Sequence, residues 1–257
     1  MRRTSLAALA GAMAACLASI PAAAQSVPMP APKPPPRAAT RPSPPMPIGP
    51  QGLPNPVAPT RQQEAMVSPG GATAFDAKQR ALIERANGYF AGVQTLVGDF
   101  VQVAPNGARS EGKFYLQKPG HLRFEYDPPS SVELIADGDT VAVRDNRLNN
   151  QTFVPQSQTP LRFLFADRVD LMKDTNVVAA YSDDMFATLV VEENQTFAGT
   201  TRLMLMFGAR DFQLRQWTVT DPQGFDTTVA VYNLDKTKKV DPSLFKIDFT
   251  NYGTPPG

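Results

Sequence analysis

From residue 96 onward, apolar and polar residues alternate in short runs, and turn residues separate the runs at short intervals. In one such run Leu122, Phe124 and Tyr126 fall on one face of an extended strand, and polar residues between them fall on the other. Consecutive strands joined by tight turns favour an antiparallel sheet that curls toward a barrel. The runs interpreted as strands are 96–103, 111–118, 120–127, 131–136, 139–145, 151–155, 176–182, 185–194, 200–208, 212–220, 225–233 and a short last one at 245–249.

Two segments break this alternation with helical spacing. An amphipathic helix of about twenty residues is predicted from Phe75 to Val93, where Thr73 and Asp76 fit a capping box at its start. The stretch TPLRFLFADRVDLM at 159–172 also looks helical, with Pro160 in its first turn. The apolar positions of the first helix are Phe75, Leu82, Ile83, Ala86, Tyr89, Phe90 and Val93. We therefore expect one mainly β domain: a helix, six strands, a helical insertion and five or six more strands.

The start of the chain has the pattern of an export signal. Residues 1–24 contain two arginines near the start, an apolar run and a small-residue cleavage site that ends at Ala24. The apolar run is short for a membrane span and is interrupted by small residues. The favoured interpretation is cleavage after Ala24. The alternative is lipidation at Cys16, which is the single cysteine of the chain.

A proline-rich segment follows at 25–72. Between Gln25 and Gly71 lie 15 of the 26 prolines, and the residues around them are mostly small or polar. Such a composition buries too little apolar surface to offset the entropy lost on ordering. We expect a disordered linker there, followed by one folded domain at 73–257.

Charge and motif content argue against several classes of function. Without Arg2 and Arg3 the chain has 23 basic and 24 acidic residues, a net charge of −1, which does not favour nucleic-acid binding. His121 is the single histidine, so a His-based catalytic triad or a His-rich metal site is not expected. The glycines are scattered at turns and form no phosphate-binding loop. We therefore expect a binding protein without catalytic residues, metal or cofactor.

The stretch RLMLMF at 202–207 is apolar on both faces of its strand. A sheet with one solvated face would not carry this pattern, so either both faces are covered or one face lines a cavity. On this strand alone, burial on both faces is favoured.

Six motifs occur in the order found in one family. They are FVQ (100–102), GKFYLQKPG (112–120), LRFEYDPP (122–129), ELIADGDTVAVRD (133–145), TPLRFLF (159–165) and VDPSLFKIDF (240–249). Each motif is weak alone, but together the segment from Phe75 to Phe249 resembles the LolA family of periplasmic lipoprotein carriers.

The resemblance implies an incomplete antiparallel β-barrel of about eleven strands with a helical lid over an apolar interior. By this resemblance Leu122 and Phe124 line the cavity for acyl chains, with neighbours Tyr126, Phe100, Phe114, Leu116, Leu134 and Ile135 in the barrel wall. The lid face would comprise Leu161, Leu164 and Phe165. Lys118 stands where the family often has an Arg that hydrogen-bonds to the lid. Because Lys lacks the planar donor fork of Arg, a lid contact of equal strength is not implied.

The same resemblance implies a function and partners. The protein would be a periplasmic monomer that carries acylated outer-membrane lipoproteins from the inner to the outer membrane. It would receive them from an inner-membrane lipoprotein-releasing ABC transporter and could deliver them to an outer-membrane acceptor lipoprotein. Two alternatives keep the same fold: a membrane-anchored lipoprotein receptor, and a module that senses lipids or lipoproteins.

Overall fold

The computed structural model describes residues 75–159, 162, 166–195 and 199–249. The helices are α3 (Ala77–Gly92) and α5 (Leu171–Asp174), with 3-10 turns η2 (Gln156–Gln158) and η3 (Pro242–Phe245). The strands are β1 (Thr95–Val103), β2 (Arg109–Gln117), β3 (His121–Tyr126), β4 (Val132–Asp137), β5 (Thr140–Asp145), β6 (Asn150–Pro155), β7 (Asn176–Ser182), β8 (Phe186–Gln195), β9 (Gly199–Gly208), β10 (Leu214–Thr220) and β11 (Asp226–Asp235). The predicted signal and proline-rich segment, 1–24 and 25–72, lie outside the described residues.

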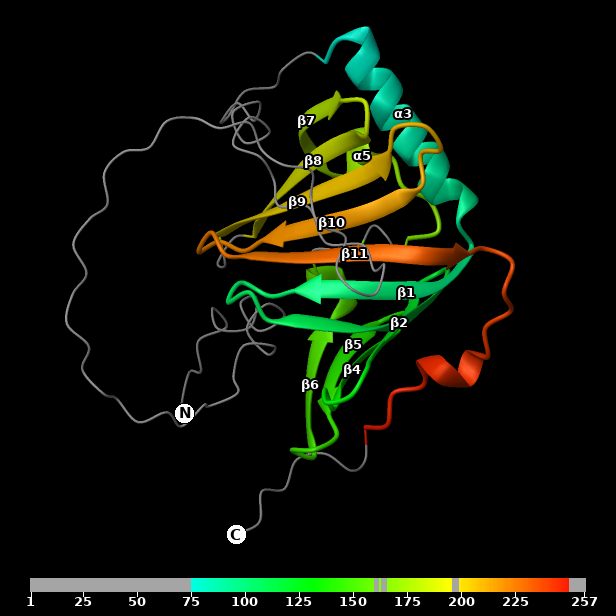
Figure 1. Ribbon diagram of the computed structural model, residues 1–257, viewed down its shortest axis with the longest axis vertical. Coiled ribbons are helices and arrows are strands. Elements are labelled where there is room, and N and C mark those ends of the chain that lie inside the picture. The colour runs from blue at the N-terminus through cyan, green and yellow to red at the C-terminus, as the bar shows by residue number, and fades with distance from the viewer. Residues whose placement is uncertain (1–74, 160–161, 163–165, 196–198, 250–257) are drawn as a thin grey trace, which may run out of the picture.

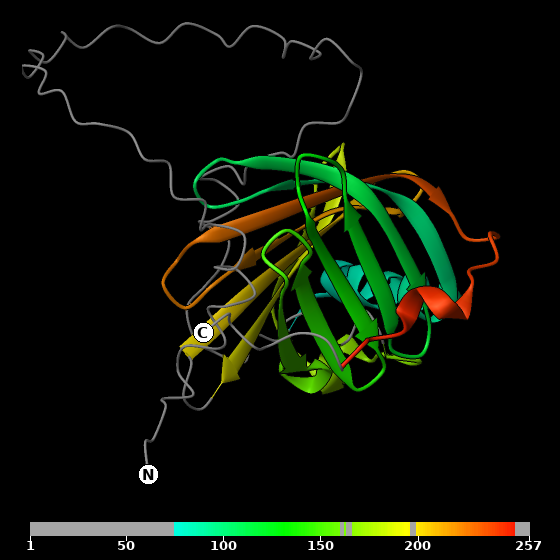
Figure 2. The same ribbon diagram turned by 90° about the horizontal axis from the view of Figure 1, so that it is seen from below.

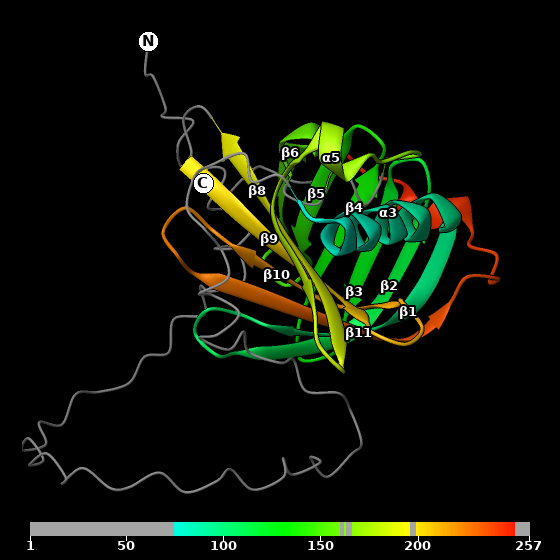
Figure 3. The same ribbon diagram turned by 90° about the horizontal axis from the view of Figure 1, so that it is seen from above.

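All eleven strands form one antiparallel sheet in the order β6-β5-β4-β3-β2-β1-β11-β10-β9-β8-β7. The first strand pairs with the last, so β1 and β11 lie at the centre. One arm, β2 to β6, extends from β1, and the other, β10 back to β7, extends from β11. The sheet curves strongly and remains open, and α3 lies inside the curve (Figures 1 to 3). The predicted mainly β, open-barrel architecture is confirmed.

Helix α3 begins at a capping box, although not at the predicted residues. The Asp76 carboxylate accepts from the Gln79 amide at 2.8 Å, and the Gln79 side chain accepts from the Asp76 amide at 2.9 Å. The prediction that paired Thr73 with Asp76 was wrong, because Asp76 is itself the N-cap and Gln79 occupies the third helical position that completes the box. Ile83, Ala86 and Phe90 bury one side of the helix against the sheet.

Strand β9 is buried on both faces, as its sequence favoured. Leu203, Leu205 and Phe207 pack into the main core inside the curve of the sheet. Met204 and Met206 pack into a second apolar cluster, which contains none of these three residues. The alternation within one strand therefore supplies two separate apolar layers.

Two predicted elements differ in the structure. The segment 245–249 is not a strand: η3 ends at Phe245, and residues 246–249 have no regular structure. Both sides of β11 are already paired, to β1 and β10, so this segment cannot join the sheet beside the strand that it follows. The helix predicted over 159–172 is not continuous, because residues 166–170 are non-helical and α5 begins only at Leu171. The Leu171 amide donates to Asn87 of α3 at 3.0 Å, which fixes where this short helix starts.

The segment 241–249, here called the strap, crosses the outer face of the β2–β6 arm (Figure 2). The Arg123 guanidinium donates to the Leu244 carbonyl at 3.0 Å, and Gln151 donates to the Asp248 carbonyl at 3.0 Å. The ring of Phe249 stacks on Phe153 of β6, with centroids 5.1 Å apart. The strap therefore ties the outside of β3 to the edge strand β6. No helix within the described ranges is long and apolar enough to cross a membrane.

Candidate functional site

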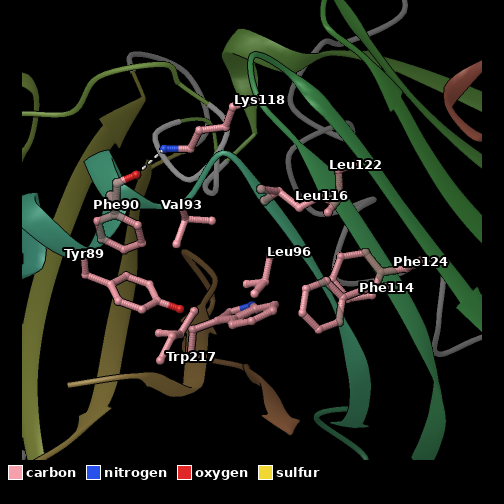
Figure 4. Close-up of a pocket in the computed structure, with 11 residues that line it drawn as sticks. Tyr89, Phe90, Val93, Leu96, Phe114, Leu116, Lys118, Leu122, Phe124 and Trp217 are labelled. Carbon is pink, nitrogen blue, oxygen red and sulfur yellow. Dashed lines mark hydrogen bonds between the residues drawn. The ribbon is translucent and has the colours of Figure 1, made fainter. Parts of the chain in front are cut away.

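A small apolar cavity of about 40 Å³ lies between α3 and the inner face of the sheet (Figure 4). Its wall consists almost entirely of aromatic and aliphatic side chains from the helix, the centre of the sheet and both arms. The lining residues are Tyr89, Phe90, Val93, Leu96, Phe114, Leu116, Lys118, Leu122, Phe124, Leu214 and Trp217.

Strand register explains why four of these residues form one surface. Phe114 of β2 lies directly opposite Phe124 of β3, and Leu116 lies opposite Leu122. Directly paired residues share a face of the sheet, and residues two apart on a strand do as well. The rings of Phe114 and Phe124 are stacked with centroids 5.7 Å apart, while Trp217 reaches Phe124 from β10 at 6.3 Å.

The structure brings Leu122 and Phe124 together in the cavity wall with Phe114 and Leu116, two of their predicted neighbours. Phe100 and Tyr126 do not line the cavity, but Phe100 packs behind it, 4.9 Å from the ring of Phe124 and 5.0 Å from that of Tyr126. The four wall residues and the layer behind them therefore form one aromatic and aliphatic cluster.

The other predicted wall residues lie farther from the cavity. The Tyr126 hydroxyl donates to Gln102 at 2.8 Å, and burial raises its pKa. Leu134 is half-buried and packs against the main core. Ile135 pairs with Arg123 and so lies on the outer face of the sheet, whereas Leu122 and Phe124 lie on the inner face. The prediction that Ile135 neighbours the cavity was wrong: adjacent strand residues point to opposite faces, so Leu134 and Ile135 cannot both point inward.

Sequence reasoning did not select Tyr89, Phe90, Val93, Leu96, Leu214 or Trp217 as cavity residues. Tyr89, Phe90 and Val93 were recognised as the apolar side of a helix, a pattern that does not show whether the helix packs tightly or leaves space. Trp217 is the single tryptophan and lies on a strand far from β3 in sequence. The alternation of its strand indicates that the side chain points inward, but it does not show which residues of other strands lie nearby.

Lys118 connects the end of β2 to the end of α3. Its Nζ donates to the Phe90 carbonyl at 2.7 Å, and the residue is only 7% exposed. This carbonyl lies in the last turn of the helix, where the regular helical partner is missing, and it also accepts from the C-cap amide of Val93 at 3.3 Å. Burial lowers the pKa of the Lys118 amine, and the charge of Asp167 opposes that effect. Lys118 thus ties the end of the helix to the end of β2 at the cavity wall (Figure 4).

The turn after Lys118 depends on glycine. Gly120 has a φ of +78°, and a Cβ there would lie 2.6 Å from the Cα of Gly138. Gly138 belongs to the β4–β5 turn. Both the backbone conformation and the close approach exclude a side chain at Gly120. The Lys-Pro-Gly sequence therefore packs two turns together beside the helix end.

The predicted lid residues Leu161, Leu164 and Phe165 lie outside the described residues. Arg162, from the same segment, donates to Glu193 of β8 at 2.7 Å. Burial raises the pKa of Glu193, and the charge and hydrogen bond of Arg162 oppose that rise. Among the described residues, no group of three or more His, Cys, Asp or Glu side chains could hold a metal ion.

Comparison with known proteins identifies the family. The family described as outer membrane lipoprotein carrier protein LolA matches residues 91–248. The chain belongs to this family. An outer-membrane lipoprotein carrier protein of Methylobacillus flagellatus is 22% identical over 172 residues, covering 64% of this chain and 83% of the relative. The corresponding protein of Chromobacterium violaceum is 23% identical over 176 residues, covering 65% and 83%.

The chain is also similar to solved structures that are distant in sequence. A LolA superfamily protein from Nitrosomonas europaea is 11% identical, with a TM-score of 0.39, and covers 66% of this chain and 98% of that chain. The Mycobacterium tuberculosis lipoprotein LppX is 8% identical, with a TM-score of 0.38, and covers 65% and 100%.

Proposed function

We propose that this LolA family member is a periplasmic carrier that binds the acyl chains of lipoproteins inside its curved sheet. It moves them from the inner to the outer membrane without catalysing a reaction. The observation that carries the proposal is the apolar cavity between α3 and the inner face of the sheet. An apolar surface of this kind favours hydrocarbon, because each buried methylene contributes about 0.8 kcal/mol.

The cavity must enlarge before it can hold an acyl chain. Its volume of about 40 Å³ exceeds the space for one water molecule but is far below the several hundred Å³ typical of ligand pockets. Movement of α3 away from β2 and β3 would separate the two walls. The hydrogen bond from Lys118 to Phe90 joins those walls, so it is one contact that such a movement must break.

The partners follow from the carrier role. Acylated outer-membrane lipoproteins are the cargo, an inner-membrane lipoprotein-releasing ABC transporter is the donor, and an outer-membrane lipoprotein is the acceptor. The carrier acts as a monomer, since one copy of the sheet encloses the cavity. The first test is to purify the tagged protein from the periplasm and identify bound molecules by mass spectrometry. Diacylated or triacylated lipoproteins are expected, and their absence together with failure to bind a synthetic lipopeptide would contradict the proposal.

A matched pair of variants separates binding from folding. Leu122→Asn places an amide in the cavity wall, whereas Leu203→Asn places one in the main core at a residue that does not line the cavity. Both leucines are nearly fully buried. Each substitution is expected to lower the free energy of unfolding by about 3 kcal/mol, but only Leu122→Asn should weaken lipopeptide binding by folded protein, by about tenfold. Equal effects of the two variants on binding would indicate an ordinary core.

A membrane-anchored receptor with the same cavity is the second candidate, and Cys16 followed by the proline-rich segment 25–72 favours it. Mass spectrometry of the mature N-terminus distinguishes the two. A mature protein that starts at Gln25 supports the carrier, and a diacylglyceryl group on Cys16 supports the receptor.

A further inference from the structure

One hydroxyl interrupts the apolar wall of the cavity. The Tyr89 hydroxyl oxygen is buried and has no hydrogen-bond partner. The ring belongs to the cavity lining, and Figure 4 shows its hydroxyl pointing toward Trp217. The backbone N–H of Leu214 lies near this oxygen but does not meet hydrogen-bond geometry, and it could in any case only donate to it. The phenolic O–H therefore remains an unused donor inside a hydrophobic space.

An unpaired buried hydroxyl is unfavourable, since desolvation of the polar group is not compensated. Burial raises the pKa of Tyr89 to about 12, so the group keeps its proton and stays a donor at any physiological pH. The site thus combines largely hydrocarbon walls with the neutral hydroxyl donor of Tyr89, beside the indole N–H of Trp217. Such a donor fits a neutral acceptor on an otherwise apolar ligand.

The position of Tyr89 shows where on the ligand this acceptor would lie. The residue is partly exposed, and Nζ of Lys236 lies 4.6 Å from the ring centroid. Its other side packs edge-on against Phe90 and Phe207, at 5.5 and 5.4 Å between centroids. Tyr89 therefore extends from the solvated rim, where Lys236 lies over its ring, to the hydrophobic interior, where its hydroxyl lies just inside the boundary. An acyl chain that enters this interior would place its linkage to the head group at this boundary.

We propose that the Tyr89 hydroxyl donates a hydrogen bond to the carbonyl oxygen through which a bound acyl chain is joined to its head group. This inference rests on the proposed acyl-binding function and adds a polar contact that sets the depth of insertion. It predicts that the site distinguishes ester-linked chains from ether-linked chains of the same length, because only the ester presents a carbonyl. Hydrocarbon burial alone would not distinguish them.

The test compares the wild type and one variant, each with two ligands that differ only in the chain linkage. The probes are a synthetic lipopeptide with two ester-linked palmitoyl chains and its analogue with two ether-linked hexadecyl chains. Tyr89→Phe removes only the hydroxyl and should leave folding unimpaired, because the buried donor had no partner. It should weaken binding of the ester probe about fivefold, the effect of one neutral hydrogen bond, and change binding of the ether probe by less than about twofold.

Tyr181→Phe is the matched control. The Tyr181 hydroxyl is also buried, but this residue packs against the second apolar cluster and not against the cavity. This control should change neither affinity. If Tyr89→Phe alters the affinities for both probes equally, or leaves ester binding unchanged or tighter, the carbonyl contact is excluded while acyl binding stands. If the wild-type protein binds neither probe, the proposed function itself fails.

Discussion

The cavity wall and the β8–β9 side of the core use the same kinds of side chain but pack differently. Leu189, Leu205 and Phe207 have no exposed surface. Leu116 and Phe124 in the cavity wall each keep 7% exposure. Helix α3 contacts β7 and β8 directly, and the empty space lies on its other side, toward β2 and β3. The difference indicates that the helix packs closely against β7 and β8, whereas an unfilled space remains between the helix and the strands β2, β3 and β10.

The same truncation in the two regions should have unequal effects, and this is the largest effect that we expect. Leu205→Ala creates a void in a filled core and should lower the free energy of unfolding by about 4 kcal/mol. Leu116→Ala extends a space that already exists and should cost about 2 kcal/mol. Urea denaturation measures both values. Equal losses would mean that the two regions are packed alike.

Loss of the hydrogen bond between Lys118 and Phe90 should lower stability less than the leucine truncations do. It should mainly change how fast an acyl probe enters the cavity. Lys118→Met removes the hydrogen bond to the Phe90 carbonyl while keeping an apolar stem of similar length. The free energy of unfolding should fall by about 1 kcal/mol, and an acyl probe should associate faster in stopped-flow experiments. Lys118→Arg retains a donor and should resemble the wild type more closely. Unchanged association in Lys118→Met would show that this bond does not control entry.

The buried amine of Lys118 should also make the free energy of unfolding rise with pH in the alkaline range. The pKa of Lys118 is lower in the folded protein than its usual 10.5, so between these two values the unfolded chain binds the proton more readily. Raising the pH through that window should stabilise the wild type relative to Lys118→Met. Chemical denaturation of both proteins at a series of pH values up to about 10 measures the difference. Parallel pH profiles would contradict the effect of burial on this amine.

The strap provides the smallest expected change. Phe249 is 58% exposed and stacks on Phe153, which is 36% exposed, so the pair removes little apolar surface from water. Phe249→Ala should lower the free energy of unfolding by about 0.5 kcal/mol and leave acyl binding unchanged. A marked loss of binding would show that the strap on the outer face supports the cavity on the inner face.

Alternation predicted the strands well because each strand of a curved sheet must keep one face buried. It failed at 245–249, where Phe245 and Phe249 alternate with polar neighbours but no partner strand is available. The cavity was only partly predictable. Leu122 and Phe124 came from the family resemblance, whereas Tyr89 and Trp217 come from a helix and from a distant strand that the fold brings to one cavity. A periodic pattern reports which side of an element is buried, and not whether the facing side chains fill the space between them.

The pairing of the first strand with the last has a consequence for how the chain folds. Within each arm every ladder joins strands that are neighbours in sequence, whereas the ladder of β1 with β11 pairs Val103 with Thr228. Closing so long a loop costs more entropy than forming a hairpin, so local ladders form sooner. We therefore expect the two arms to form as separate meanders and the central ladder to join them last. The cavity, which draws its walls from both arms, would come into existence only with that final step.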